Sequence, residues 1–179
     1  PLHLSAARGD AQMSKLIFGA DSSMTPLHID NQNEQGDTAT HLAVRGDYLD
    51  TVQLMCSAAA DLDIRNEQGS TAFHEAATTG NVKLVDLLAG PLASVGTTDE
   101  AGNCALHNAA LTGSVPVIKR LLSLGSVPKK RNDAGETALF CAASRGHTGA
   151  VQALLDVAEE EGAKSTIYGQ TVAHAAAVG

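Results

Sequence analysis

The stretch Asn33-Glu34-Gln35-Gly36 is a four-residue phrase that recurs along the chain at a fixed interval. It returns as Asn66-Glu67-Gln68-Gly69, Asp99-Glu100-Ala101-Gly102 and Asn132-Asp133-Ala134-Gly135. The closing glycines lie at positions 36, 69, 102 and 135, so each of these steps spans 33 residues, and Gly169 follows after 34. A period of this length is the sequence signature of a repeat protein, in which each unit packs on its neighbours along the chain.

The motif after each glycine predicts the start of a helix. It reads Thr38-Ala39-Thr40-His41, Thr71-Ala72-Phe73-His74, Cys104-Ala105-Leu106-His107, Thr137-Ala138-Leu139-Phe140 and Thr171-Val172-Ala173-His174. Threonine is a favoured N-cap because its hydroxyl accepts a backbone N–H that has no partner within the helix. Alanines follow and let neighbouring helices approach closely. An apolar cluster such as Leu87-Leu88 ends each unit and predicts a second helix with one apolar stripe.

Glycines also mark the predicted turns. Those at the phrase ends favour a positive φ, which glycine adopts without steric cost. Gly80, Gly113 and Gly146 fall between the two predicted helices of their units, where a tight connection is needed. Each unit is therefore predicted to form turn, helix, turn and helix, and to bury its apolar face only against its neighbours.

These residues resemble the ankyrin repeat, a unit of about 33 residues with a T-P-L-H-x-A motif. Pro1-Leu2-His3-Leu4-Ser5-Ala6-Ala7 is the closest literal match, and Asp61 to Gly69 looks like the β-hairpin segment of that family. The resemblance covers essentially the whole chain. It implies an all-α solenoid of stacked helix-turn-helix units with short β-hairpin loops, in which the motif histidine braces the turn through the capping threonine.

We expect one continuous array from residue 1 to residue 179. A partial first repeat covers 1–32 and carries an irregular insertion within Asp21–Gln32. Full repeats cover 33–65, 66–98, 99–131 and 132–167, and a partial last repeat covers 168–179. The apolar ending Ala175-Ala176-Ala177-Val178-Gly179 leads us to expect further repeats in the intact protein, because terminal repeats normally carry polar outer faces.

Departures from the family pattern predict local changes. Alanine or valine replaces the motif proline in the later units, and we expect little damage because proline at the first helical position is favoured but dispensable. Cys104 stands where threonine is usual and Phe140 where histidine is usual. Both replacements are expected to cost their repeats part of the local hydrogen bonding.

Composition argues against several classes of protein. The formal charge of −8 and the pI of about 5.2 oppose nucleic-acid binding, which normally needs a basic face. Cys56, Cys104 and Cys141 are odd in number and form no C-x-x-C pair, which argues against a disulfide framework or a structural zinc site. Free thiols fit a reducing compartment, so we expect a cytoplasmic protein, with the nucleus as the alternative. No apolar run approaches the roughly eighteen residues of a membrane span, so direct membrane insertion is not expected.

Candidate chemical sites are weak, and we expect no catalytic residue, metal or cofactor. His74-Glu75 begins the zinc-protease motif H-E-x-x-H, but Thr78 stands at the second histidine. One histidine per repeat places these rings about a helix diameter or more apart, which is too far for one metal. Cys141 is expected to be a packed thiol. Lys129-Lys130-Arg131 is expected to be a solvated loop rather than a nuclear-import element.

Acidic residues recur at the predicted hairpin tips, at positions 34, 67, 100 and 133, joined by Asp37 and Glu136. Repeats stack at about 10 Å, and the Debye length is about 8 Å at physiological salt. Neighbouring carboxylates would therefore partly reinforce one another and favour a basic peptide or protein. The alternative is that the tips are polar only because they face water.

The resemblance implies that a partner protein contacts the hairpin tips and the inner, concave face of the first helices. The positions that match are Glu34, Gln35, Asp37, Arg45, Glu67, Gln68, Ser70, Thr78, Thr79, Glu100, Ala101, Asn103, Asn108, Leu111, Thr112, Asp133, Ala134, Glu136, Ser144 and Arg145. The sequence thus predicts a non-catalytic protein-interaction scaffold. The alternatives are a substrate-presenting or regulatory module of a larger multidomain enzyme or signalling protein, and a passive spacer.

Overall fold

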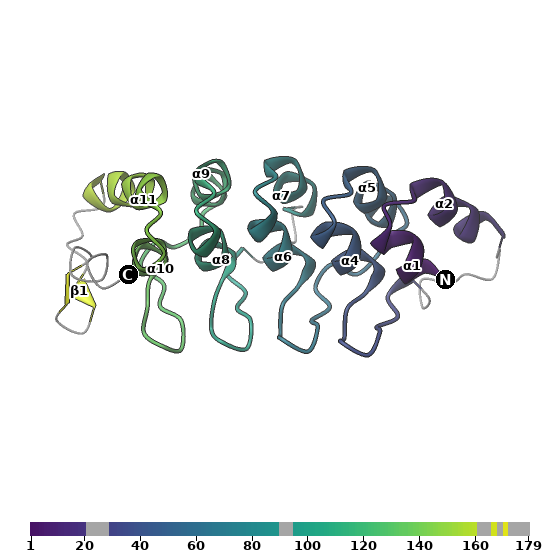
Figure 1. Ribbon diagram of the computed structural model, residues 1–179, viewed down its shortest axis with the longest axis horizontal. Coiled ribbons are helices and arrows are strands. Elements are labelled where there is room, and N and C mark those ends of the chain that lie inside the picture. The colour runs from purple at the N-terminus through teal and green to yellow at the C-terminus, as the bar shows by residue number, and fades with distance from the viewer. Residues whose placement is uncertain (21–28, 90–94, 161–165, 168–169, 172–179) are drawn as a thin grey trace. The chain divides into compact units, whose positions relative to one another are not determined.

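The computed structural model describes residues 1–20, 29–89, 95–160, 166–167 and 170–171 (Figure 1). They belong to two compact units, Pro1–Ala93 and Ser94–Gly179, which are described separately below as unit 1 and unit 2. Most of the insertion predicted within Asp21–Gln32 lies outside the described residues. Residues 168, 169 and 172–179 of the predicted last repeat also lie outside the described residues. One continuous array over both units stays a prediction.

Unit 1 contains helix pairs in which the first helices form one row and the second helices another. The first helices are α1 (Leu2–Ala7), α4 (Ala39–Arg45) and α6 (Ala72–Thr79), and each contacts the next in this order. The second helices are α2 (Ala11–Ala20), α5 (Leu49–Ser57) and α7 (Val82–Leu88), which also contact one another in order. This is the predicted helix-turn-helix stack (Figure 1).

Unit 2 repeats the same arrangement. Its first helices are α8 (Ala105–Thr112) and α10 (Ala138–Ser144), and its second helices are α9 (Val115–Ser123) and α11 (Thr148–Glu160). Each row is again in contact, α8 with α10 and α9 with α11. After α11, β1 (Thr166–Ile167) pairs antiparallel with β2 (Gln170–Thr171), in the register Thr166 to Thr171 and Ile167 to Gln170. The all-α prediction is confirmed, with this short hairpin as a local addition.

The predicted threonine caps begin the first helices. Thr38 adopts an extended backbone with ψ of 168°, and its hydroxyl accepts the His41 N–H at 3.4 Å. In return, His41 Nδ1 accepts the Thr38 backbone N–H at 3.2 Å. Thr71 and His74 form the same reciprocal pair at the start of α6. Two backbone N–H groups without partners inside the helix are thereby satisfied at each cap.

The two departures from the motif have different outcomes. Cys104 keeps the cap, because its backbone N–H donates to His107 Nδ1 at 3.2 Å and its sulfur lies 3.0 Å from that nitrogen. The predicted loss at Cys104 is therefore wrong: a thiol occupies the same place as the hydroxyl. Phe140 has no ring nitrogen and retains only the bond from its own N–H to Thr137 Oγ1 at 3.4 Å. The loss predicted there is confirmed.

Small side chains fill the contact between successive first helices. The motif alanines are essentially fully buried, and they are Ala39, Ala43, Ala72, Ala76, Ala77, Ala105, Ala109, Ala110, Ala138, Ala142 and Ala143. Larger residues of the second helices, such as Met55, Leu84 and Ile118, are also fully buried. Aromatic side chains form only 3% of the sequence, so alanine and aliphatic side chains make up most of the core. Each helix pair buries these side chains against its neighbours.

Gly36 shows why the tip of each hairpin ends in glycine. Its φ is +73°, and a Cβ there would lie 2.7 Å from the Glu67 backbone nitrogen of the next hairpin. Any other residue would therefore be strained in backbone and would push the neighbouring hairpin away. Gly102 has the same φ sign and the same close approach to Asp133 in unit 2.

Candidate partner-binding surface

The first residue of the recurring phrase closes each hairpin tip. Asn33 Oδ1 accepts the backbone N–H groups of Gln35 at 3.0 Å and Asp37 at 2.8 Å. The Asn33 backbone N–H donates to Asp37 O at 2.9 Å, and its carbonyl accepts the Gly36 N–H. Asn66 makes the same set of bonds. These tips are therefore turns that a side chain closes. At the base of one hairpin in unit 2, Arg131 and Thr137 also pair antiparallel.

In unit 2 the Asp99 side chain makes the same two bonds, and Asn132 Oδ1 accepts the Glu136 N–H. Asn or Asp recurs at this position in the sequence, but we predicted no role for it from the sequence. The signal was present, because these two residue types have a side-chain oxygen that can accept N–H groups two and four positions ahead. The role of this residue in closing the turn could therefore have been predicted from the repeating pattern.

Neighbouring hairpins are hydrogen-bonded within each unit. In unit 1 the Glu67 backbone N–H donates to Gln35 O at 3.0 Å, and Asn66 Nδ2 donates to Asp37 Oδ1 at 2.9 Å. In unit 2 the Asp133 N–H donates to Ala101 O at 3.1 Å. The Asn132 side-chain amide likewise reaches Asn103 Oδ1 at 2.9 Å. These bonds fix the distance between adjacent tips, so their side chains are presented at a constant interval.

Motif histidines connect three of the first helices, α1, α4 and α8, to the following hairpin. His41 Nε2 lies 3.0 Å from Ser70 O, His107 Nε2 lies 3.1 Å from Glu136 O, and His3 Nε2 lies 3.1 Å from Asp37 O. His41 Nδ1 accepts a backbone N–H, so it carries no proton and Nε2 is the donor. Burial lowers the pKa of His41 below 6.5, which keeps the ring neutral. The predicted structural role of the histidine is confirmed and extends across the repeat boundary.

Arg45 forms ion pairs with Asp37 and with Glu75. Its guanidinium binds both oxygens of Asp37, at 2.9 and 3.1 Å, and Glu75 Oε1 at 2.9 Å. Burial alone would raise the pKa of Asp37, but hydrogen bonds from Arg45 and Asn66 outweigh it and lower that pKa below 3.8. Glu75 was absent from the predicted surface residues, because its contact with the preceding repeat is not visible in the sequence.

Two of the predicted surface residues are buried. Asp37 is only 3% exposed, so its predicted place in an exposed acidic row is wrong, because Arg45 and Asn66 draw its carboxylate inward. Ser70 is also buried, and its carbonyl receives the His41 bond. Both residues stabilise the hairpins that carry the exposed tips.

The remaining predicted residues lie at the surface. The exposed ones are Glu34, Gln35, Arg45, Glu67, Gln68, Thr78, Glu100, Ala101, Thr112, Asp133, Ala134, Ser144 and Arg145. Half-buried are Thr79, Asn103, Asn108, Leu111 and Glu136. Within each unit, the hairpin tips and the exposed residues of the first helices form one surface, which we call the tip surface. Contact between these residues and a partner stays a prediction.

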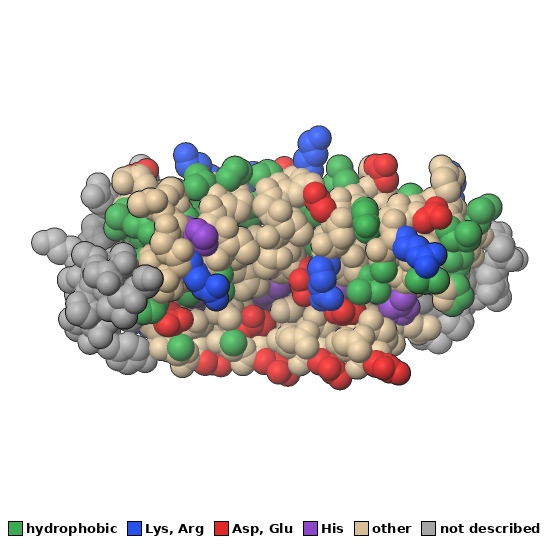
Figure 2. Space-filling model, in the orientation of Figure 1, with side chains coloured by type: hydrophobic (Ala, Val, Ile, Leu, Met, Phe, Trp, Pro, Cys, Tyr) green, Lys and Arg blue, Asp and Glu red, His purple; other side chains and the backbone are tan. Residues whose placement is uncertain are grey.

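Charge is unevenly distributed on the tip surface. In each unit, acidic side chains gather on the hairpin loops, at the lower edge of the view in Figure 2. In unit 1 the exposed acids Asp61 and Asp63 precede Glu67 in the same connection, with Arg65 between them. In unit 2 the acids at the tips stand beside the basic run 129–131, whose Lys129 and Arg131 are exposed as predicted. Unit 1 is therefore the more acidic of the two tip surfaces.

The three cysteines of the described part of the chain lie in different environments. Cys141 is buried, as predicted, and burial raises its pKa to about 12. Burial also raises the pKa of Cys56. Burial would raise the pKa of Cys104, but its hydrogen bond with His107 outweighs this and lowers it. Among the described residues no group of three or more His, Cys, Asp or Glu side chains could hold a metal ion. No described helix is both long and apolar enough to cross a membrane.

Comparison with known proteins agrees with the repeat geometry. A search of the curated proteins found no match. A family model described as "Ankyrin repeats (3 copies)" matches residues 2–99, 43–132 and 106–179, which together span nearly the whole chain. Ankyrin repeats are generally protein–protein interaction modules and are typically non-catalytic. With the helix pairs, capped turns and 33-residue period already described, this match shows that the chain belongs to the ankyrin-repeat family.

Proposed function

We propose that this chain is a non-catalytic scaffold that binds a protein or peptide with a basic surface through its tip surface. The observation that carries the proposal is the pair of exposed carboxylates Glu34 and Glu67 in unit 1, one on each of two adjacent hairpins. The bond from the Glu67 N–H to Gln35 O at 3.0 Å holds these hairpins together. Two carboxylates of like charge favour a basic partner through charge complementarity. Because the hairpins are already held in place, binding needs little further ordering of the tips.

The partner is most strongly attracted to unit 1. Its tip surface adds Asp61 and Asp63 to the two glutamates, whereas the tips of unit 2 are offset by a basic run. The formal charge of −8 over the chain draws a basic partner in the same direction and accelerates association at low salt. Arg45 removes Asp37 from this set by pairing with it, so the exposed tips account for the attraction.

The compartment proposed for this function is a reducing one, the cytoplasm or the nucleus. Its support is the set of free cysteines, since Cys56, Cys104 and Cys141 are all unpaired. Free thiols persist where thiol reductants are abundant.

Affinity capture with variant baits tests the proposal. Glu34→Lys with Glu67→Lys reverses the tips of unit 1, and Asp50→Lys with Asp86→Lys reverses two exposed residues of the second helices α5 and α7. Both variants have the same net charge. We expect the tip variant to lose the captured protein and the second-helix variant to retain it. Equal loss with both variants would mean that net charge alone governs binding, and retention by both would exclude the tip surface of unit 1.

A further inference from the structure

Helix α5 is flanked at each end by a residue with an unfavourable backbone conformation. Asp47 precedes the helix and Ala59 follows it, and both have a φ of +59°. Among the described residues other than glycine, these two have a positive φ. The left-handed region crowds the Cβ atom against the backbone, so it costs free energy for alanine. Asp47 is partly compensated, because its Oδ1 accepts the Asn81 side-chain amide at 2.7 Å, whereas the methyl group of Ala59 can accept no such bond.

Glycine occupies the corresponding positions beside other second helices. The turn that precedes each of these helices has a glycine with positive φ, at Gly9, Gly80, Gly113 and Gly146. At the end of α9, Gly125 has a φ of +90° and is the equivalent of Ala59. Its N–H donates to Leu122 O, just as the Ala59 N–H donates to Cys56 O. The turn geometry is therefore shared, and the strain beside α5 comes from the residues that adopt it.

Buried hydroxyls add a second cost to the same helix pair. The structure shows no hydrogen-bond partner for Thr51 Oγ1 in α5 or for Thr40 Oγ1 in α4. Their equivalents in the pair α8–α9 are Val117 and Leu106, which are fully buried and apolar. A buried hydroxyl without a partner costs free energy because it has given up its bonds to water. The pair α4–α5 thus carries costs that α8–α9 avoids at the same positions.

The hairpin side of this repeat is held by bonds that do not involve α5. His41 Nε2 donates to Ser70 O at 3.0 Å, and the Glu67 N–H donates to Gln35 O at the same distance. These bonds join α4 and its hairpin to the next hairpin along the chain. They can therefore stay in place when α5 loses its own backbone hydrogen bonds.

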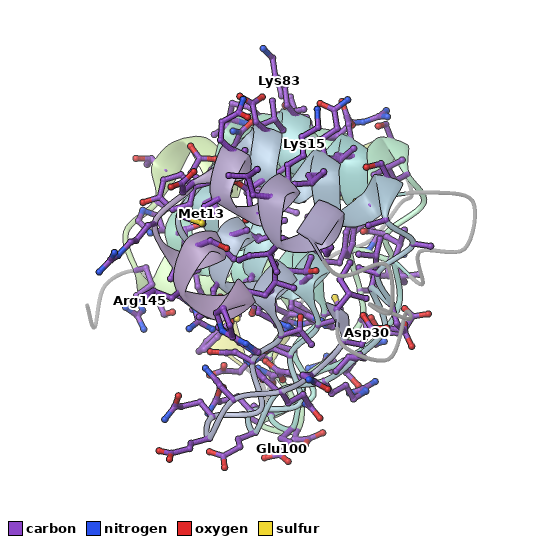
Figure 3. The ribbon with its side chains drawn as sticks, turned by 90° about the vertical axis from the view of Figure 1, so that its right-hand side faces the viewer. Met13, Lys15, Asp30, Lys83, Glu100 and Arg145 are labelled. Atoms are coloured by element: carbon purple, nitrogen blue, oxygen red, sulfur yellow. The ribbon has the colours of Figure 1, made fainter. Side chains whose placement is uncertain are left out.

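The chain is also anchored directly after α5. The Asp61 N–H donates to Asp30 Oδ1 at 2.9 Å, which fixes the start of the connection to the next hairpin. Asp30 is labelled in Figure 3, together with Lys15 of α2 and Lys83 of α7. These two helices are the neighbours that α5 contacts in the second row. An opening of residues 49–60 would therefore stop at Asp61 and leave α2 and α7 in place.

We propose that residues 49–60 are an opening segment of unit 1, which unfolds locally while the hairpin side of the same repeat stays closed. Its opening interrupts the second row between α2 and α7 and exposes the buried side chains of Val52 and Met55. Unit 1 thus combines a fixed row of hairpins with a second row that yields at one helix. The inference does not depend on the proposed binding of a basic partner, because the opening segment lies outside the tip surface.

Native-state hydrogen exchange measures this opening in the original chain. After correction for intrinsic rates, we expect the α5 amides to exchange at least about tenfold faster than those of α4 and of α9. Their exchange should depend only weakly on urea, because a local opening exposes little surface. The α4 amides should show the steeper dependence of a larger unfolding.

Exchanging residues between α5 and α9 tests the cause of the opening. Thr51→Val with Ala59→Gly gives α5 the residues of α9, and should slow its exchange by about tenfold or more, because an unpaired hydroxyl and a strained φ are removed. The reciprocal variant, Val117→Thr with Gly125→Ala, should accelerate exchange in α9 by a similar factor. A Cβ at Gly125 would have no heavy atom within 4 Å, so the added methyl group brings strain without a clash.

Three results would overturn the inference. The first is a set of α5 amides that exchange no faster than those of α9. The second is α5 exchange with the same steep urea dependence as the slowest amides, since α5 would then open only when the whole unit unfolds. The third is a pair of reciprocal variants that leave the exchange of α5 and α9 unchanged. Fast exchange in α5 that follows the exchanged residues is the expected result.

Discussion

Arg45 and Asp37 have neutral equivalents in the first repeat of unit 2. These are Leu111 and Asn103, counted from the caps Thr38 and Cys104. Unit 1 therefore holds a buried carboxylate that needs a cation, whereas unit 2 holds a neutral amide that accepts the Asn132 side-chain bond. The same fold thus accommodates either a charged pair or a neutral hydrogen bond at these equivalent positions.

We predict that Arg45→Leu destabilises the chain while Asp37→Asn combined with Arg45→Leu largely restores it. The single variant leaves the Asp37 carboxylate buried with Asn66 but without its cation, and should cost about 1–3 kcal/mol, a range reduced because Arg45 is half exposed. The double variant reproduces the residues of unit 2. Urea unfolding measures the difference, and a double variant as unstable as the single one would contradict the assignment.

Thr51 contains a buried hydroxyl for which the structure shows no hydrogen-bond partner. Its equivalent in unit 2 is Val117, which is fully buried as well. Thr51→Val should therefore stabilise the chain by about 1 kcal/mol, because an unpaired polar group is removed without a change of shape. Thr71→Val is the matched control and should destabilise by about 1 kcal/mol, because its hydroxyl lies 2.9 Å from His74 Nδ1 at the helix cap. Thermal unfolding that shifts the same way for both variants would show that this reasoning is wrong.

At the scale of the element, the stability of the hairpin tip depends more on the side chain of Asn66 than on the exposed side chains beside it. Asn66 accepts the N–H groups of Gln68 and Ser70 and also donates to Asp37 in the preceding hairpin. We predict that Asn66→Ala destabilises the chain by about 1–3 kcal/mol, because these groups lose their partners. Gln68→Ala, at the exposed tip, should change stability by less than about 0.5 kcal/mol. Similar values for both variants in denaturant unfolding would contradict this role of Asn66.

The link from α4 to the next hairpin should make unit 1 sensitive to mild acid. Burial lowers the pKa of His41 in the folded chain below its ordinary value of 6.5, so the unfolded state binds more protons as the pH falls through that value. The contribution of His41 to stability must then decrease on acidification from about pH 7 to pH 5, where Asp37 is still ionised in both states. His41→Phe, which copies the residue at position 140, should be less stable at pH 7 and lose less stability over this range. Equal losses in the two proteins, followed by thermal unfolding, would argue against His41 as the source.

The elements also show what the sequence could and could not predict. Helix starts were predictable because Thr38 and Thr71 carry the cap chemistry in their own side chains. Turn positions were predictable because Gly36 and its equivalents lie at a fixed period. The burial of Asp37 was not, since it results from the Arg45 and Asn66 contacts, which join residues brought together only by stacking.

At the scale of the whole molecule, the prediction of repeats was strong and the prediction of binding residues was partial. A repeat fold can be predicted from one chain because every unit restates the same pattern, and neighbours supply the burial. Surface residues such as Glu34 and Glu67 were placed correctly at exposed tips. Glu75 was missed, because its role depends on Arg45 of the preceding repeat.

The central functional claim is that a partner binds the tip surface, and hydrogen exchange with and without the captured partner tests it most directly. Protection is predicted at the hairpin tips 33–37 and 66–70 of unit 1 and at the exposed ends of α4 and α6, with little change in α5 and α7. Protection confined to α5 and α7, with the tips exchanging as in the free chain, would contradict the account.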